Sequence, residues 1–366
     1  MKSKEIKYIK SDIIEGVILS DIKEGIMKIK GILILILSLI SVFIITSCDS
    51  PNTDVSQLYD DIYTENTEYS LDGKQQIINR FDEAGLSAVD IGNQINMTNW
   101  EVIDEFCSHD EDGEAVVYVI NDDGSCTEYD LSITDDKLHV KMQVSSGGNE
   151  SVVTYEQEYD AVYWDYTDKG YLFFGAEHPA GDFGPWLETT IRVKPMDADL
   201  RGMTQKYLNV IGYEDNNLFI ENWNENDFTV LNLYDIYEVI TGNIDAENEI
   251  IPESDFESVI SKYLDISVSE IHENADYDPG ADAYHFSSRT VEAKGSTPDM
   301  PYPEVVSVTD NDDGTITLLV EAVWPKYWDD KAYVHEVTVR PEGDNFKYVS
   351  NRIVEKKMDT KWYVGR

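Results

Sequence analysis

Three aspartates placed around a glycine form the pattern in this chain that comes nearest to a metal site. Asp276, Asp278 and Asp282 lie on a short segment that also contains Pro279 and Gly280. Carboxylate oxygens on a tight loop are ligands that Ca²⁺ prefers, but the bidentate glutamate that an EF-hand carries at its twelfth position is missing here. A plain Asp-Pro-Gly turn between a helix and a strand is therefore the preferred interpretation, and a metal site is the alternative.

Motifs that would carry a nucleophile, a phosphate or a catalytic zinc ion do not occur. The sequence lacks Gly-x-Ser-x-Gly, His-Glu-x-x-His and the P-loop. His335 and Glu336 are neighbours in an alternating segment, so their side chains point to opposite faces of a strand and cannot share a metal. We therefore predict no catalytic residue and no cofactor. A carboxylate pair could still hydrolyse glycosidic bonds, but among 72 acidic residues no pair stands out.

A loop rich in glycine and proline is the candidate for ligand binding. The segment from His178 to Trp186 contains two large aromatic residues, and irregular loops on a rigid sheet are usual places for binding sites. If a small molecule or a glycan binds there, Phe183 and Trp186 are the predicted stacking surfaces. The alternative, which most loop aromatics follow, is that both rings pack inward and plug the edge of the sheet.

A short apolar run near the N-terminus indicates where the protein is located. Lys28 and Lys30 precede fifteen mostly apolar residues, Gly31 to Ile45. A helix that spans a bilayer needs about 20 apolar residues, so this shorter run is typical of a secretory signal. It ends in Ile45, Thr46, Ser47 and Cys48, a sequence that resembles the lipobox of bacterial lipoproteins.

The resemblance implies cleavage by signal peptidase II before Cys48 and a lipid, such as palmitate, on that cysteine. The protein is then anchored to the membrane and faces the outside of the cytoplasmic membrane. Met27 begins a complete signal peptide over 27–47, so we expect 1–26 to be an upstream extension, and the polar residues 48–70 to form an acidic tether. An ordinary N-terminal membrane anchor with a chance cysteine is the alternative.

The chain is strongly acidic, with 28 Lys and Arg against 72 Asp and Glu and a formal net charge of −44. Such a field repels nucleic acid, so we exclude nucleic-acid partners, and we attribute the acidity to solubility at a cell surface. Hydrophobic residues make up 42% and aromatic residues 11% of the chain, which is enough for packed cores and excludes disorder for most of it.

Two cysteines remain once Cys48 is assigned to lipid. Cys107 and Cys126 form an even pair that could be oxidised to a disulfide outside the cytoplasm. Two free buried thiols are the equal alternative, because spacing along the sequence does not define the geometry of a bridge.

We expect residues 71–245 to form an N-terminal α+β domain. A helix is expected over Gly73 to Ala84, with Gly85 as its C-cap. From Trp100 to Ala176 the periodicity of two and the recurring turn signals, among them a hairpin turn at Asn121 to Gly124, predict an antiparallel meander that forms one sheet. Two further helices, Asp199 to Ile211 and Asp227 to Ile240, should enclose a strand near Leu218 to Trp223. The second of these helices is expected to have Asp227 as its N-cap and Gly242 as its C-cap.

Residues 252–366 predict a C-terminal α+β domain, separated from the first near Asn243 to Pro252. Ser254 and Glu257 resemble a capping box before a helix with an apolar stripe. Alternating segments then predict one sheet built from Asp282 to Ser288, Glu304 to Thr309, Thr315 to Trp324, Ala332 to Arg340 and Phe346 to Val354. In Thr315 to Trp324 every second residue from Ile316 is apolar, which predicts one apolar face. A helix on a curved antiparallel sheet is similar in layout to cystatin and NTF2-like domains, and this likeness transfers no functional residue.

Two classes of function follow. The missing nucleophile motifs favour a noncatalytic surface module that binds a small molecule, a glycan or a protein. An extracellular hydrolase that uses carboxylates is the alternative, because such an enzyme leaves no local motif. A structural part of an envelope assembly is the third possibility and depends on the anchor alone.

Overall fold

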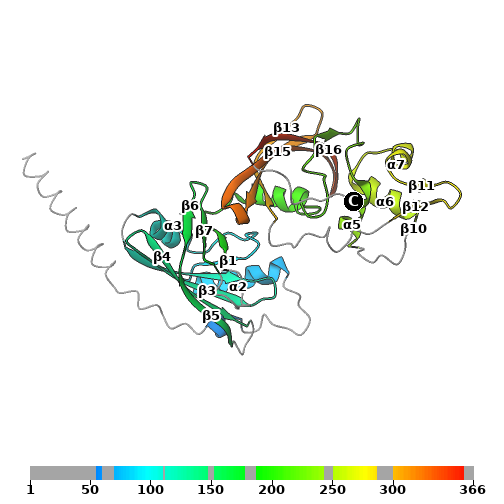
Figure 1. The fold of residues 1–366 in the computed structure, drawn as a ribbon. Helices are drawn as coiled ribbons and strands as arrows, with labels where there is room; N and C mark the ends of the chain where they lie inside the picture. Colours follow the sequence, from blue (N-terminus) through cyan, green and yellow to red (C-terminus); the bar gives the residue numbers. More distant parts are fainter. Residues whose placement is uncertain are drawn as a thin grey trace, which may run out of the picture. The chain divides into compact units, whose positions relative to one another are not determined.

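The computed structural model describes residues 55–59, 70–109, 112–146, 152–177, 187–242, 250–286 and 300–357. From Val55 onward these residues belong to one unit with an α+β fold (Figure 1). The predicted signal peptide, Cys48 and most of the tether lie outside the described residues. No described helix is both long enough and apolar enough to cross a membrane.

The first sheet has the order β1-β2-β3-β4-β5, with β1 parallel to β2 and the other pairs antiparallel. Gly124 adopts φ 74° in the predicted turn after β2, which only glycine adopts at little cost. The strands are β1 (Ala88–Asp90), β2 (Gly113–Ile120), β3 (Cys126–Thr134), β4 (Lys137–Ser145) and β5 (Val153–Asp160).

The first predicted helix is confirmed as α2 (Leu71–Glu83). Its N-cap Ser70 accepts a hydrogen bond from the backbone of Gly73, and Gly85 follows it with φ 75°. The apolar stripe is fully buried and packs with Tyr118 of β2; it consists of Ile77, Ile78 and Phe81.

The predicted single meander is wrong in two respects. Residues Trp100–Ser108 form a helix, α3, because Ile103, Phe106 and Cys107 recur at helical spacing and enter the core below the sheet. The last strands do not continue the first sheet but form a second one, β6-β7-β8, whose central strand is buried throughout. These strands are β6 (Tyr163–Tyr166), β7 (Tyr171–Gly175) and β8 (Thr189–Arg192).

The middle of the chain departs from the predicted elements. The helix α4 (Ala198–Met203) continues as a π-helical turn over Thr204–Leu208. The next helix, α5 (Leu233–Thr241), is capped by Asn232, so the predicted N-cap Asp227 is wrong, whereas the predicted C-cap Gly242 is confirmed at φ 62°. Asp227 accepts hydrogen bonds from Thr229 instead. Only Trp223–Asn224, β9, is a strand in this region.

The C-terminal sheet has the order β13-β14-β15-β16-β9 and is antiparallel. The predicted apolar face of β14 is buried at Leu318, Val320 and Ala322. The strands are β13 (Tyr302–Asp310), β14 (Ile316–Trp324), β15 (Asp329–Glu342) and β16 (Asn345–Lys356), and short 3-10 turns cover Val55–Tyr59 and Pro325–Tyr327.

A smaller sheet, β10-β12-β11, lies beside α6, so the prediction that Asp282 to Ser288 joins the large sheet is wrong (Figure 1). The helix α6 (Glu253–Tyr263) begins after Pro252, and the predicted capping box at Ser254 is wrong, since that side chain does not cap the helix. A capping box occurs instead at Ser267 and Glu270 of α7 (Val268–Asn274). The strands are β10 (Ile250–Pro252), β11 (Tyr277–Asp278) and β12 (Ala283–His285).

The predicted domain boundary falls largely on 243–249, outside the described residues. On either side of it the side chains share one core, in which Phe219 and Ile236 pack in the same cluster as Phe256, Ile260 and Tyr348. Independent folding of 252–366 stays a prediction. The cores themselves change earlier in the chain, between Val193 and Tyr207.

Candidate functional site

A pocket of about 720 Å³ is the candidate binding site. Its volume lies within the range of about 300–1,000 Å³ that is usual for small-molecule sites. Strands β2, β3 and β4 form its floor, β8 and the turn after β2 form its sides, and the segment after β14 adds Pro325 and Lys326.

The floor of the pocket is apolar because strand alternation places one row of side chains on this face. It consists of Val119, Tyr129, Met142 and Val144, and all but Val144 are buried. The Tyr129 ring packs edge-to-face against Phe174 at 5.3 Å, and its hydroxyl accepts a hydrogen bond from Thr189 Oγ1 at 3.1 Å. Burial raises the pKa of Tyr129, so the phenol remains neutral and a ligand meets no charge there.

The rim of the pocket is acidic, with Asp122, Asp123 and Glu188 against the single cation Lys326 among its described lining residues. Asp122 pairs with Lys74 Nζ at 2.5 Å. Asp123 accepts hydrogen bonds from the hydroxyl and the backbone N–H of Ser125, and these bonds lower its pKa. Both aspartates therefore help to hold the turn in place.

A buried ionic cluster fixes the wall of the pocket from behind. Glu304 of β13 accepts a hydrogen bond from the Tyr171 hydroxyl at 2.8 Å, pairs with Lys169 at 2.7 Å and contacts the Arg192 guanidinium. Burial alone would raise the pKa of Glu304, but Lys169 and Arg192 together hold it below its usual value. Next to this cluster, Asn93 accepts from the Arg192 backbone N–H and donates to the Tyr302 hydroxyl.

The predicted stacking residues Phe183 and Trp186 lie in 178–186, outside the described residues. Glu188 and Thr189 follow that segment after Leu187 and line the pocket. The sequence reasoning missed Tyr129 and Tyr302. Only the alternation in β3 could have indicated Tyr129, and nothing local marks Tyr302, because its place at the pocket depends on pairing across the whole chain.

The three aspartates of the possible Ca²⁺ site do not form one of the groups of convergent ligand atoms in the described ranges. Asp278 Oδ1 accepts a hydrogen bond from the Gly280 backbone N–H at 2.8 Å, while Asp276 and Asp282 are exposed. Asp282 takes a left-handed conformation, φ 48°, where the chain returns into β12. This is the arrangement of the Asp-Pro-Gly turn.

A different set of side chains is close enough to hold a metal ion. Glu253 and Glu257 of α6 and His272 of α7 bring one ligand atom each to within 4.8 Å of one another. The sequence analysis missed this group because Glu257 was read as a capping residue. The signal it overlooked is a pair of glutamates four residues apart at the start of a helix.

Cys107 and Cys126 are buried in different cores and form no disulfide with each other, so the structure agrees with the alternative of two buried thiols. Burial, with a smaller contribution from Asp104, raises the pKa of Cys107 to about 12. The thiol is therefore protonated at neutral pH and a poor nucleophile.

Comparisons with known proteins add a family but no activity. One family model matches residues 44–366, and its description is "Family of unknown function (DUF6070)". The chain matches no curated protein and no solved structure. The likeness to cystatin and NTF2-like domains therefore stays a prediction, and a function has to be argued from the residues of this chain.

Proposed function

We propose that this chain, which belongs to the DUF6070 family, is a lipid-anchored binding module that holds a small molecule outside the cytoplasmic membrane. The pocket over β2, β3 and β4 is the observation that carries the proposal, because it combines a ligand-sized volume with an apolar floor and a polar rim.

The state of the rim carboxylates favours binding over hydrolysis. A glycosidase needs one carboxyl group that is protonated at the start of the reaction, with a raised pKa. Asp123 has a lowered pKa and is held by Ser125, and Asp122 is held by Lys74. Two of the three acids at the rim are therefore committed to the fold, and the hydrolase alternative has little support at this site.

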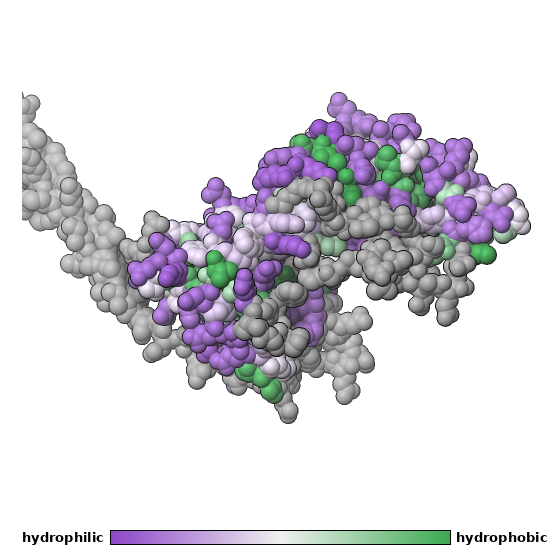
Figure 2. All heavy atoms as spheres, in the orientation of Figure 1, coloured by the Kyte–Doolittle hydropathy of each residue, from purple (hydrophilic) through white to green (hydrophobic). Residues whose placement is uncertain are grey.

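The charge of the rim indicates the class of ligand. Asp123 and Glu188, together with Asp122 and its partner Lys74, outweigh the lining lysine Lys326, so the rim repels anions, and the net charge of −44 adds to that repulsion. A neutral or cationic compound with an apolar body suits the pocket. Figure 2 shows that hydrophilic residues dominate the face of the molecule in view, interrupted by small hydrophobic patches, which favours a compact ligand over a protein that needs a broad apolar surface.

A pocket-filling substitution tests the site. The probe is a library of neutral and cationic small molecules with short oligosaccharides and anionic analogues, screened by ligand-observed NMR. We expect neutral or cationic compounds to bind the full chain and a Val354→Trp control, because Val354 is exposed on β16 and does not line the pocket. Binding should be lost in Val144→Trp, whose indole would occupy the pocket. Compounds that still bind Val144→Trp, or bind nowhere, would refute the pocket, and cleavage of a bound oligosaccharide would favour a hydrolase.

The lipid anchor rests on the lipobox match alone and has its own test. Mass spectrometry of the membrane fraction should find a chain that begins at Cys48 and carries lipid, and Cys48→Ala should abolish both the processing and the anchoring. An intact N-terminus upstream of Cys48 would refute the anchor and leave the pocket proposal untouched.

A further inference from the structure

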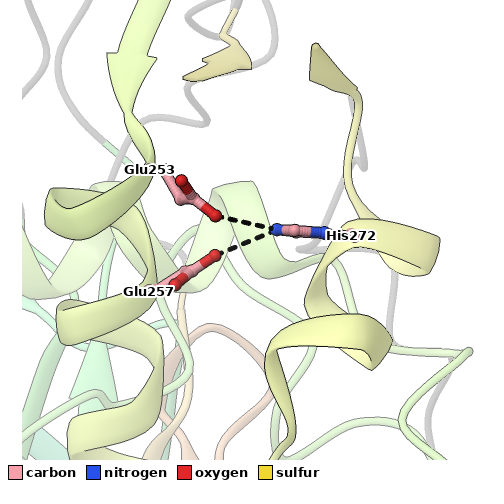
Figure 3. A group of neighbouring side chains, drawn as sticks. All are labelled: Glu253, Glu257 and His272. Carbon is pink, nitrogen blue, oxygen red and sulfur yellow. Dashed lines mark hydrogen bonds and ion pairs between the residues drawn. The ribbon is translucent and has the colours of Figure 1, made fainter. Parts of the chain in front are cut away.

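Two helices bring a histidine and two glutamates to one point, and none of the three residues lines the pocket. Glu253 and Glu257 are four residues apart on α6, so they lie on one face in successive turns. His272 reaches them from α7, and all three side chains point toward one another (Figure 3). Its Nε2 lies 3.4 Å from Glu253 Oε1 and 3.1 Å from Glu257 Oε1.

The neighbouring side chains hold these ligand atoms in place. The Tyr284 hydroxyl donates a hydrogen bond to Glu257 Oε1 at 2.9 Å. The His272 ring stacks on Tyr277, with centroids 3.7 Å apart and planes inclined by 7°. Below them, Phe256 and Ile260 bury the other side of α6. Ligands that are oriented by a second layer of contacts on regular elements are a general property of metal sites.

The charges of the group are unbalanced. In the parts of the chain that the structure describes, no lysine or arginine lies within ion-pair distance of either glutamate, and His272 is the only basic side chain that does. Two carboxylates with a neutral imidazole carry two negative charges, and the group is partly buried, with 16% of the Glu257 side chain and 29% of His272 exposed. A divalent cation would balance that charge.

Two of the three distances between the ligand atoms are close to those of a tetrahedral zinc site, and the third, between the two carboxylate oxygens, is within 4.8 Å. Ligand bonds of about 2.0–2.2 Å place neighbouring ligand atoms of a tetrahedron about 3.3–3.6 Å apart. The two distances from Nε2, 3.1 and 3.4 Å, are close to that spacing. Imidazole favours zinc over magnesium or calcium, which prefer sets made of oxygen alone.

We propose that Glu253, Glu257 and His272 bind one Zn²⁺ ion, which links α6 to α7 and keeps a fourth position for water. Three protein ligands and one open position are the arrangement of zinc sites that can also bind an exogenous ligand. The proposal does not depend on the pocket.

A metal-free arrangement accounts for the same contacts and is the competing outcome. A protonated His272 would then donate to both carboxylates, and Glu253 would be stabilised by the N-terminal end of the α6 dipole. The two arrangements differ in their affinity for zinc, because a protonated histidine has no free lone pair on nitrogen with which to bind the ion.

Zinc titration of the full chain after treatment with a chelator separates the two. Isothermal titration calorimetry at pH 7.5 should give one saturable Zn²⁺ site above the weak cation binding expected of an acidic surface. Co²⁺ in place of zinc should show the visible absorption bands of a tetrahedral centre. Glu257→Gln and His272→Ala should each weaken binding at least tenfold.

Two further variants keep the outcome decisive. His272→Cys should retain zinc and add a thiolate-to-cobalt band, which shows that loss of binding in His272→Ala is not a loss of fold. His139→Ala should leave the titration unchanged, because the two nitrogens of His139 contact two different carboxylates, Asp160 and Glu158. Absence of a saturable site, or a site that survives both Glu257→Gln and His272→Ala, would overturn the proposal.

Discussion

Two clusters of charged side chains in this molecule differ in how the charge of their carboxylates is balanced. Around Glu304 the protein provides the counterions itself, since Lys169 and Arg192 contact Glu304, and Lys169 and Lys331 contact Glu321. Around Glu253 and Glu257, within the described ranges, no lysine or arginine lies at ion-pair distance, and the only basic partner is His272. Glu304 and Arg192 are buried, whereas about a third of Glu253 and of His272 is exposed to solvent.

The difference separates a structural role from a binding role. A buried carboxylate that already has two cations has no capacity left for a ligand, and its removal leaves buried charges behind. A partly exposed group with excess negative charge can exist without a ligand but gains from a cation. Substitutions in the two clusters should therefore change different measured quantities.

The largest effect is expected for Glu304→Ala. The substitution leaves Lys169 and Arg192 next to each other without their shared carboxylate, and breaking a buried pair in this way costs about 3–5 kcal/mol. Urea unfolding at pH 7 should show this fall in the free energy of unfolding.

The control for Glu304 is an ion pair of the same kind at the surface. Glu336 pairs with Arg352, and 62% of the arginine side chain is exposed. Glu336→Ala should cost less than about 1 kcal/mol, because solvent screens the pair. A loss below about 1 kcal/mol for Glu304→Ala as well would remove the distinction between the clusters.

His335 differs from both clusters, because the buried imidazole is kept neutral and needs no counterion. Its ring is fully buried, with Nδ1 donating to Asn351 Oδ1 and Nε2 accepting from the Tyr213 hydroxyl. Burial lowers the pKa of His335 to about 4, from 6.5. The unfolded chain therefore takes up the proton first, and the contribution to stability is complete above about pH 6.5 and is lost as the pH falls toward 4.

The pH effect of His335 should reach about 3 kcal/mol, because each pKa unit corresponds to about 1.4 kcal/mol. The measurement is the free energy of unfolding of the wild type and of His335→Gln at several pH values, since the many carboxylates titrate equally in both. The wild type should lose about 3 kcal/mol more than the variant between pH 6.5 and pH 4. Parallel curves would show that His335 is not neutralised by the fold.

Periodicity predicted the elements that have one buried face. The stripe of α2 and the alternation in β14 appear where expected, because a single apolar face is visible in the local sequence. The helix α3 was missed since it is short and lies between strands. The predicted start of α5 at Asp227 was too early, because an aspartate whose side chain stabilises a turn resembles an N-cap. Sheet membership was not predictable from local patterns: β6 and β12 read as strands but pair in other sheets.

The candidate sites depend on long-range contacts and were largely out of reach of the sequence. The sequence analysis weighed three aspartates that are close along the chain, whereas His272 lies fifteen residues after Glu257 and meets it through the packing of α6 and α7. Likewise, Tyr302 reaches the pocket lined by Tyr129 only through the complete fold. Polar residues that are close in the sequence mostly form turns, whereas the candidate sites here are formed by residues from separate helices and strands.

A smaller effect, on zinc rather than on stability, is expected for Tyr284→Phe. The substitution removes the hydrogen bond that orients Glu257 and should weaken zinc binding about tenfold, the lower end of effects from outer-layer partners. Tyr333→Phe is the matched control, since its buried hydroxyl donates to the Phe219 carbonyl, away from the zinc ligands. Each variant should lose about 1 kcal/mol of stability. Equal zinc affinities in the two variants would show that Tyr284 does not position Glu257.

The smallest effect is expected for His139→Ala. This variant tests whether any histidine between two acidic side chains binds zinc, or only His272. His139 contacts Asp160 through Nδ1 at 2.9 Å and Glu158 through Nε2 at 3.1 Å, and its side chain is 41% exposed. The hydrogen bond to Asp160 is the main cause that raises the pKa of His139, so its stabilisation is present below about pH 6.5 and is lost as the pH rises through the higher folded value.

Because solvent screens the exposed pairs of His139, the change in the free energy of unfolding should stay below about 0.5 kcal/mol at pH 5.5 and vanish at pH 8. Urea unfolding at the two pH values measures it, and the zinc titration should not change. Weaker zinc binding in His139→Ala would mean that the acidic surface as a whole binds the ion, and that convergence on one nitrogen of His272 has no special role.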